Sequence, residues 1–117
     1  MITSDVGSRA ALLQTGEDGI LHPLGYYSCK FKSYQRNYAT IEKEALALLM
    51  ALEHFKVYVS HSPVVVYTDN NPLVFIEKMK LKNQRLLRWS LTLQPYNLNI
   101  RHIKGTDNLI ADALSRA

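Results

Sequence analysis

Hydrophobic and polar positions along the chain follow two spacings, and a short run near the middle is the clearest strand signal. Residues 64–67 read Val-Val-Val-Tyr, and an unbroken, β-branched run of this length is typical of a strand that is covered on both faces. Asp69 lies at its carboxyl end, before Asn70-Asn71-Pro72, where an asparagine can cap a helix that begins at the proline. Ligand chemistry gathers outside the carboxyl ends of strands in open α/β sheets, so Asp69 is a candidate functional residue.

The strongest helical pattern covers residues 40–59, with Thr40 as the expected N-cap. Its apolar side chains recur at the spacing of one buried helix face, at Ile41, Ala45, Leu48, Leu52 and Phe55. Three shorter helices are predicted at residues 72–79, 84–94 and 109–116, with Pro95 ending the second of them.

The remaining apolar segments have the features of strands. Residues 1–5 are a strand stub, and residues 10–14 and 24–29 predict an antiparallel pair around the polar turn 15–19. Residues 96–103 alternate between apolar and polar side chains. The order of strands, helix, strand, helices, strand and helix predicts a mixed-sheet α/β fold in a single domain, residues 1–117.

Composition narrows the class of protein. A chain of 117 residues holds about one domain, and its apolar fraction of 47% and charged fraction of 21% are ordinary for a globular protein. The net charge of +4 and pI of about 9.3 permit a polyanionic partner without demanding one. No run is long enough for a membrane span, and no signal peptide is evident. The single Cys29 cannot form an internal disulfide, so we expect an intracellular protein in which Cys29 is a small, half-buried side chain.

Three carboxylates occupy positions where a charge is costly. Glu44 shares the apolar face of the long helix, whereas Glu42 lies off that face and is expected to be solvated. Asp69 ends a buried strand, and Asp112 lies within the apolar run of the last helix. One such acid is more often a structural group, but three in a chain without a Cys or His cluster favour a site for magnesium or manganese. Carboxylates that hold two such ions can support phosphoryl transfer.

Several motifs together resemble the ribonuclease H domain of reverse transcriptases from gypsy-type LTR retrotransposons, across essentially the whole chain. The matching pieces are Ser4-Asp5-Val6-Gly7, Tyr26-Tyr27-Ser28, Arg36-Asn37-Tyr38-Ala39-Thr40-Ile41-Glu42-Lys43-Glu44-Ala45-Leu46-Ala47, Tyr67-Thr68-Asp69-Asn70-Asn71-Pro72-Leu73, Arg88-Trp89, and residues 108–116 with Ala111-Asp112-Ala113-Leu114. The resemblance implies an RNase H-like five-stranded mixed sheet flanked by helices. It also implies metal-dependent cleavage of the RNA strand of an RNA–DNA hybrid, within a polyprotein whose polymerase and integrase regions adjoin this domain.

The resemblance also assigns the acids. Four acids bind two magnesium ions in this family, and the second, third and fourth fall on Glu44, Asp69 and Asp112. The first falls on Ile2, and the first strand, which is central in the family's sheet, is cut to a stub. Asp5 is a poor substitute because, three residues on in an extended chain, it points to the opposite face. We therefore expect weak or no catalysis.

Other residues have two interpretations each. The basic stretch with Lys78, Lys80, Lys82, Arg85 and Arg88 is either a phosphate-tracking surface or a solvated helix face, while Trp89 is expected in the core. Asn70 can contact a hybrid's minor groove or cap a helix, and the cap is the preferred interpretation.

His102 can aid product release or be a partly buried histidine at a strand end, and the second interpretation is preferred. Lys104, in the loop that follows, is a further candidate nucleic-acid contact. Arg9, where the family usually has glycine, is expected to point to solvent. The alternative for the whole chain is a non-catalytic, domesticated module that binds nucleic acid or docks on a protein.

Overall fold

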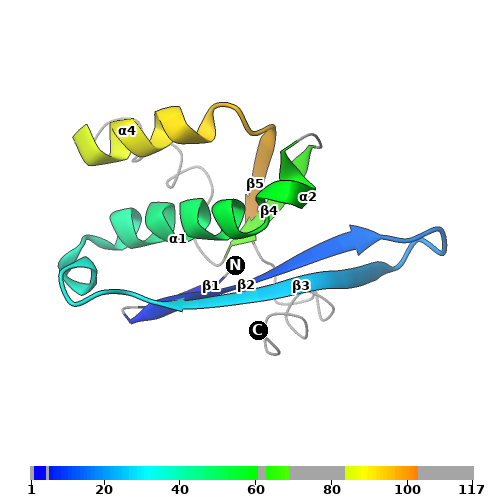
Figure 1. Ribbon diagram of the computed structural model, residues 1–117, viewed down its shortest axis with the longest axis horizontal. Coiled ribbons are helices and arrows are strands. Elements are labelled where there is room, and N and C mark those ends of the chain that lie inside the picture. The colour runs from blue at the N-terminus through cyan, green and yellow to red at the C-terminus, as the bar shows by residue number, and fades with distance from the viewer. Residues whose placement is uncertain (1, 5, 61–62, 69–83, 103–117) are drawn as a thin grey trace.

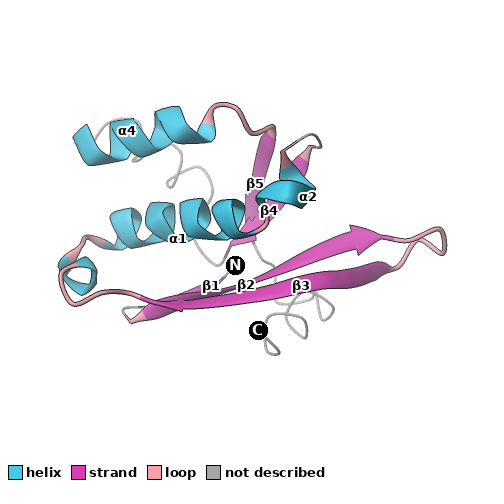
Figure 2. Cartoon of the chain, viewed as in Figure 1, coloured by secondary structure: helices cyan, strands magenta, loops and turns pink. Residues whose placement is uncertain are grey.

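The computed structural model describes residues 2–4, 6–60, 63–68 and 84–102, which form two small sheets and a layer of helices (Figure 1). In chain order the elements are β1 (Ile2–Thr3), β2 (Gly7–Thr15), β3 (Leu21–Lys30), the 3-10 turn η1 (Gln35–Asn37), α1 (Thr40–His54), α2 (Lys56–Val59), β4 (Val64–Thr68), α4 (Gln84–Leu93) and β5 (Leu98–His102). Helix α1 contacts β1 and β2 on one side and α4 on the other, so it lies between the three-stranded sheet and α4 (Figure 2).

Strands β2 and β3 form a long antiparallel hairpin, which confirms the predicted pair and extends it at both ends. The register slips by one residue after Leu12, which pairs with Gly25, whereas Leu13 pairs with Pro23. Leu24 is therefore the extra residue of a β-bulge, which increases the local twist of the hairpin. A Cβ atom at Gly25 would lie 3.1 Å from the Phe55 ring, so a larger residue there would require that ring to shift slightly.

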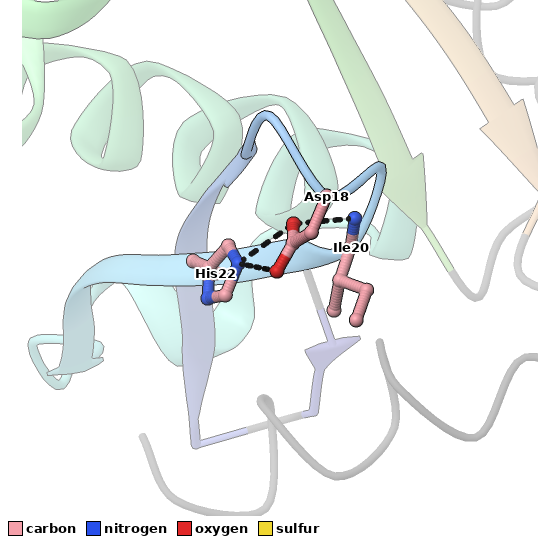
Figure 3. A network of polar contacts seen from close by, with 3 residues as sticks. All are labelled: Asp18, Ile20 and His22. Atoms are coloured by element: carbon pink, nitrogen blue, oxygen red, sulfur yellow. Dashed lines mark hydrogen bonds and ion pairs between the residues drawn. The ribbon is translucent and has the colours of Figure 1, made fainter.

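The hairpin turn depends on one glycine and one carboxylate. Gly19 has a φ of 76°, which other residues rarely adopt. The Asp18 carboxylate accepts a hydrogen bond from the Ile20 N–H at 3.0 Å and lies 3.1 Å from Nε2 of His22 (Figure 3). These contacts lower the pKa of Asp18 below its ordinary value, the Ile20 N–H having the larger effect.

Helix α1 buries the face that its spacing predicts, including Ile41, Ala45 and Leu48. Two details of the prediction are wrong. Thr40 is the first helical residue, and Ala39 stands at the N-cap without a side-chain hydrogen bond. The helix ends at His54, because Phe55 leaves helical geometry before α2 begins.

Helix α4 confirms the predicted helix of residues 84–94 almost to its bounds. Leu86 and Leu93 are buried in the same core cluster as the α1 face, and Trp89 packs against that cluster as predicted. Leu87 and Leu91 lie on its exposed side. None of the helices in the described part of the chain is long and apolar enough to cross a bilayer.

Strands β4 and β5 pair in parallel, with Val64 opposite Leu98 and Thr68 opposite His102. In β5 the predicted alternation is confirmed, since Leu98 and Ile100 are half-buried and Asn99 is exposed. The expectation that β4 is covered on both faces is wrong, because Val65 is 45% exposed.

The described strands thus make one sheet in the order β1-β2-β3 and a second of β4 and β5. This confirms a mixed α/β fold, while a single five-stranded sheet stays a prediction. The helices predicted at residues 72–79 and 109–116 lie outside the described residues.

Candidate functional site

Glu44 is the predicted site residue whose surroundings the structure describes best. It lies in the second turn of α1 and is only 4% exposed, as its place on the apolar face predicts. A cavity of about 260 Å³ lies beside it, lined by Thr3, Ser4, Thr40, Lys43 and Glu44. Glu44 therefore borders a small polar cavity between the start of α1 and the end of β1.

The chemistry of this cavity is that of hard oxygen donors. Three hydroxyls and one carboxylate line it, and oxygen ligands of this kind suit magnesium or manganese. Lys43, which is also buried, is the one basic residue of this lining, and its single positive charge equals the single negative charge of Glu44. No three His, Cys, Asp or Glu side chains come together in the described ranges, and Asp69 and Asp112 lie outside those ranges. The oxygen atoms around Glu44 are of the kind that magnesium or manganese binds, and Glu44 supplies the one carboxylate among the residues that line the cavity.

The end of β1 borders this cavity, and a tight turn follows it. Ile2 pairs with Arg9 and Thr3 with Ser8, and the Ser4 N–H donates a hydrogen bond to the Gly7 carbonyl at 2.8 Å. Ile2 thus occupies the start of β1, two residues before the turn, and Arg9 is exposed as expected. Asp5 lies outside the described residues.

The carboxyl ends of β4 and β5 meet at one edge, because the two strands are parallel. Thr68, the residue before Asp69, is buried there. His102 is the last residue of β5 and is exposed, so the preferred interpretation of a partly buried histidine at a strand end is wrong.

The two arginines of the basic stretch, Arg85 and Arg88, have different surroundings. Arg85 forms an ion pair with Glu42 across the α1–α4 interface, with Nη1 and Oε2 2.5 Å apart, and its guanidinium lies 4.1 Å from the centre of the Tyr38 ring. The hydrogen bond to Glu42 raises the pKa of Arg85. The expectation that Glu42 is solvated is wrong, because its side chain is 11% exposed beneath α4.

For Arg85 and for Arg88, the phosphate-tracking surface and the solvated helix face both stay open as interpretations. Arg88 is exposed on α4, one residue before Trp89, and can contact a polyanion without breaking the Glu42 ion pair. Asn70, Lys104 and the three lysines of the basic stretch lie outside the described residues.

Sequence reasoning did not find the cluster of Tyr38, Glu42, Arg85 and Trp89. The Tyr38 ring lies 6.3 Å from that of Trp89, centre to centre, and 43 positions separate Glu42 from Arg85. The helical spacing of α1 places Glu42 beside its buried face, but only the position of α4 decides that a cation covers it. No local signal therefore predicts this pair.

A mixed α/β domain in which a helix brings a buried glutamate against a short first strand is consistent with the RNase H-like class. The family model of the RNase H-like domain found in reverse transcriptase matches residues 2–96, and the chain belongs to this family.

Two relatives are the Transposon Tf2-3 and Transposon Tf2-4 polyproteins of Schizosaccharomyces pombe. Each is 39% identical over 117 residues, an alignment that covers 97% of this chain. The chain spans 9% of the length of these polyproteins.

Proposed function

We propose that this domain is descended from a gypsy-type retrotransposon ribonuclease H that hydrolyses the RNA strand of RNA–DNA hybrids, and that the chain itself is a weak or inactive catalyst. The observation that carries the proposal is the burial of Glu44 beside a cavity that the end of β1 lines. A buried carboxylate is costly unless a cation or hydrogen bonds compensate it, so its place in a chain of this family favours a functional role.

Glu44, Asp69 and Asp112 are the residues that would hold magnesium or manganese. When bound, a pair of such ions activates water and stabilises the leaving oxygen of a phosphodiester. The part of Glu44 is to present its carboxylate from the rigid second turn of α1. The hydroxyls of Thr3, Ser4 and Thr40 can orient water or a phosphate oxygen near that carboxylate.

The weakness follows from Ile2. Its place in β1, just before the residues that line the Glu44 cavity, puts an apolar residue where the family resemblance requires the first acid. Fewer carboxylates mean weaker attraction for a divalent cation and less compensation of charge in the transition state.

The test is cleavage of a labelled RNA–DNA hybrid in magnesium by the chain, by Ile2→Asp, and by Ile2→Asp with Glu44→Gln. We expect Ile2→Asp to be faster than the chain by about tenfold or more, and Glu44→Gln to remove that gain. Equal rates for the chain and Ile2→Asp would overturn the claim of impairment. A gain that survives Glu44→Gln would overturn the role of Glu44.

A non-catalytic nucleic-acid binder is the second candidate, and the exposed Arg88 favours it. Affinity for an RNA–DNA hybrid should fall with salt, and Arg88→Ala should weaken it while leaving the melting temperature unchanged. Arg85→Ala is a poor probe of binding, because it also breaks the ion pair with Glu42. If the affinity for the hybrid responds neither to salt nor to Arg88→Ala, the α4 surface around Arg88 does not bind nucleic acid.

A further inference from the structure

Basic and aromatic side chains gather at one end of the molecule, around the start of α1. Figure 1 shows η1 and the beginning of α4 at this same end of α1. Neither residues 30–41 nor the residues of α4 include an Asp or a Glu, and the basic residues of these two segments are Lys30, Lys32, Arg36, Arg85 and Arg88. This end of the chain therefore carries a surplus of positive charge, which attracts a polyanion.

Three aromatic rings lie in a row within this basic region. The Tyr34 ring lies 6.1 Å from the Tyr38 ring, centre to centre, in an edge-to-face arrangement, and the Tyr38 ring lies 6.3 Å from that of Trp89. Tyr38 and Trp89 are half-buried, whereas Tyr34 is 56% exposed. The row therefore begins in the core at Trp89 and ends at Tyr34 in a ring that a partner can reach.

The 3-10 turn η1, which carries this end of the row, is held by its own hydrogen bonds. The Gln35 side-chain oxygen accepts a hydrogen bond from the Lys32 N–H at 2.8 Å, and the Tyr38 N–H donates one to the Gln35 carbonyl at 3.0 Å. The Arg85 guanidinium lies over the Tyr38 ring and is itself paired with Glu42. The rings are thus positioned before a partner binds, and a preorganised surface loses less conformational freedom on binding.

An accessible aromatic ring among cations is the arrangement that binds unpaired nucleotides. The ring stacks on a base, and the cations contact the phosphates on either side of it. Bases within a duplex are already stacked on their neighbours, so such a ring selects single strands over double strands. The exposed cations beside this row are Arg36, from the same turn as Tyr34, and Arg88, one helical turn beyond Arg85 on α4.

We propose that Tyr34 is a stacking site for an unpaired nucleotide of single-stranded DNA or RNA, with Arg36 and Arg88 contacting the adjoining phosphates. This rests on the nucleic-acid-binding function proposed above, and it adds a partner whose bases are unpaired. Tyr38 packs against the Tyr34 ring and sets its position, and Arg85 holds Tyr38 in turn.

The single tryptophan of the chain makes this site observable. Because Trp89 lies in the ring row, a base that stacks on Tyr34 should change the Trp89 emission when a twelve-nucleotide oligothymidylate or oligouridylate is added. The titration needs no magnesium and no cleavage, so it is independent of the catalytic test. Binding of either strand with a change in emission supports the proposal, and the tighter strand identifies DNA or RNA as the partner. Binding of neither strand, or binding that leaves the Trp89 emission unchanged, would overturn it.

Substitutions at Tyr34 separate stacking from other contacts. Tyr34→Ala should weaken the affinity for oligothymidylate about fivefold or more, whereas Tyr34→Phe keeps the ring and should bind within about twofold of the chain. The matched control is Tyr58→Ala on α2, at a tyrosine that is 60% exposed, and it should leave the affinity unchanged. Equal affinities of Tyr34→Ala and Tyr58→Ala would overturn the proposal, and so would weak binding by Tyr34→Phe.

A strand that has the same phosphates but no bases separates stacking from charge. The abasic strand should bind more weakly than oligothymidylate and should not respond to Tyr34→Ala. Equally tight binding of the abasic strand would mean that charge alone acts, and would overturn the proposal.

A blunt RNA–DNA hybrid distinguishes this site from the surface that binds duplexes. Its affinity should fall in Arg88→Ala but not in Tyr34→Ala, because its bases are paired. A hybrid that does not bind contradicts the duplex-binding function, while the effect of Tyr34→Ala on single strands is measured separately. An equal loss of hybrid and single-strand affinity in Tyr34→Ala would overturn the stacking site.

An acidic protein segment is the other partner that a basic, aromatic surface can take. Polyglutamate of the same charge as the oligonucleotide should bind through charge alone, so its affinity should not depend on Tyr34. If polyglutamate loses as much affinity in Tyr34→Ala as oligothymidylate does, the surface binds an acidic protein and the proposal is overturned.

Discussion

The α1–α4 interface and the groove between β2 and β4 differ in how completely this chain covers its helices and its strands. At the helix interface Leu86 is fully buried, Glu42 is covered by Arg85, and Arg85 stacks on Tyr38. At the groove, which residues 10–15 and 64–67 line, the described residues leave about 680 Å³ between two strand edges, and Val65 is 45% exposed. The same apolar face of α1 contributes to both regions.

The difference arises from where each element makes its backbone hydrogen bonds. A helix satisfies its main chain internally and needs only a side-chain contact to be buried. A strand needs a neighbour on each side, and a missing neighbour exposes a row of donors and acceptors. The described β1 pairs with β2 only at Ser8 and Arg9, and β4 pairs only with β5, so the helix layer is closed while the described sheet layer has open strand edges.

The largest effect is expected from truncating the centre of the helix interface. Leu86→Ala should lower the free energy of unfolding by about 2–5 kcal/mol, because it removes buried atoms and leaves a cavity. The matched control is Leu87→Ala on the exposed side of the same helix, which should cost about 0.5 kcal/mol or less. Urea denaturation of both variants measures the difference, and equal losses would show that α4 does not pack on α1 as described.

The ion pair in the same interface should have a smaller effect. Arg85→Ala leaves the buried Glu42 carboxylate without this cation, so the melting temperature should fall further than in Arg88→Ala. In a Glu42→Gln background the effect of Arg85→Ala should shrink, because no carboxylate is then left uncompensated. Thermal melts of the chain, Arg85→Ala, Glu42→Gln and the double variant measure this coupling. Additive effects of the two substitutions would mean that the pair contributes nothing to stability.

The sequence predicted the helices and strands of both regions, but not which of their side chains are covered by other elements. The helical spacing of apolar residues was sufficient to predict α1 and α4, and the alternation of apolar and polar residues was sufficient to predict β5. Both patterns depend on residues that are near one another in sequence. The burial of Glu42 was missed because α4, far along the chain, covers it. The exposure of Val65 was missed because an apolar run predicts a covered strand, while the coverage itself depends on residues that are far away in sequence.

The candidate site was predictable in part for the same reason. Glu44 stands on a helical face that spacing alone predicts to be buried, and the structure confirms that burial. Its cavity with Thr3 and Ser4 depends on how the β1 turn meets α1, which no local pattern encodes. Whether Asp69 and Asp112 approach Glu44 stays a prediction.

The open side of the sheet should tolerate a polar substitution that the helix layer does not. Val65→Thr should change the free energy of unfolding by about 0.5 kcal/mol or less, since nearly half of the residue is exposed. Val59→Thr, at the buried end of the groove, should cost about 1–3 kcal/mol because its hydroxyl is removed from water. Urea denaturation distinguishes them, and a large loss at Val65 would mean that the groove is closed in solution.

The smallest effect is expected at the hairpin turn, which belongs to neither region. The pKa of Asp18 is lowered below 3.8, chiefly by the Ile20 N–H and then by His22, so the folded chain holds the ionised form better than the unfolded chain does. Its contribution to stability is present above pH 3.8 and is lost as pH falls through the lower folded value.

Asp18→Asn keeps an oxygen for the Ile20 N–H but cannot ionise, so it isolates this contribution. The chain should melt slightly above the variant at neutral pH, and the gap should close in acid below pH 3.8. Because the two proteins differ only at residue 18, their difference in melting temperature removes the acid response that they share. A gap that stays constant through the acid range would mean that the Asp18 contacts do not persist in solution, whereas closure would show that these contacts order the turn.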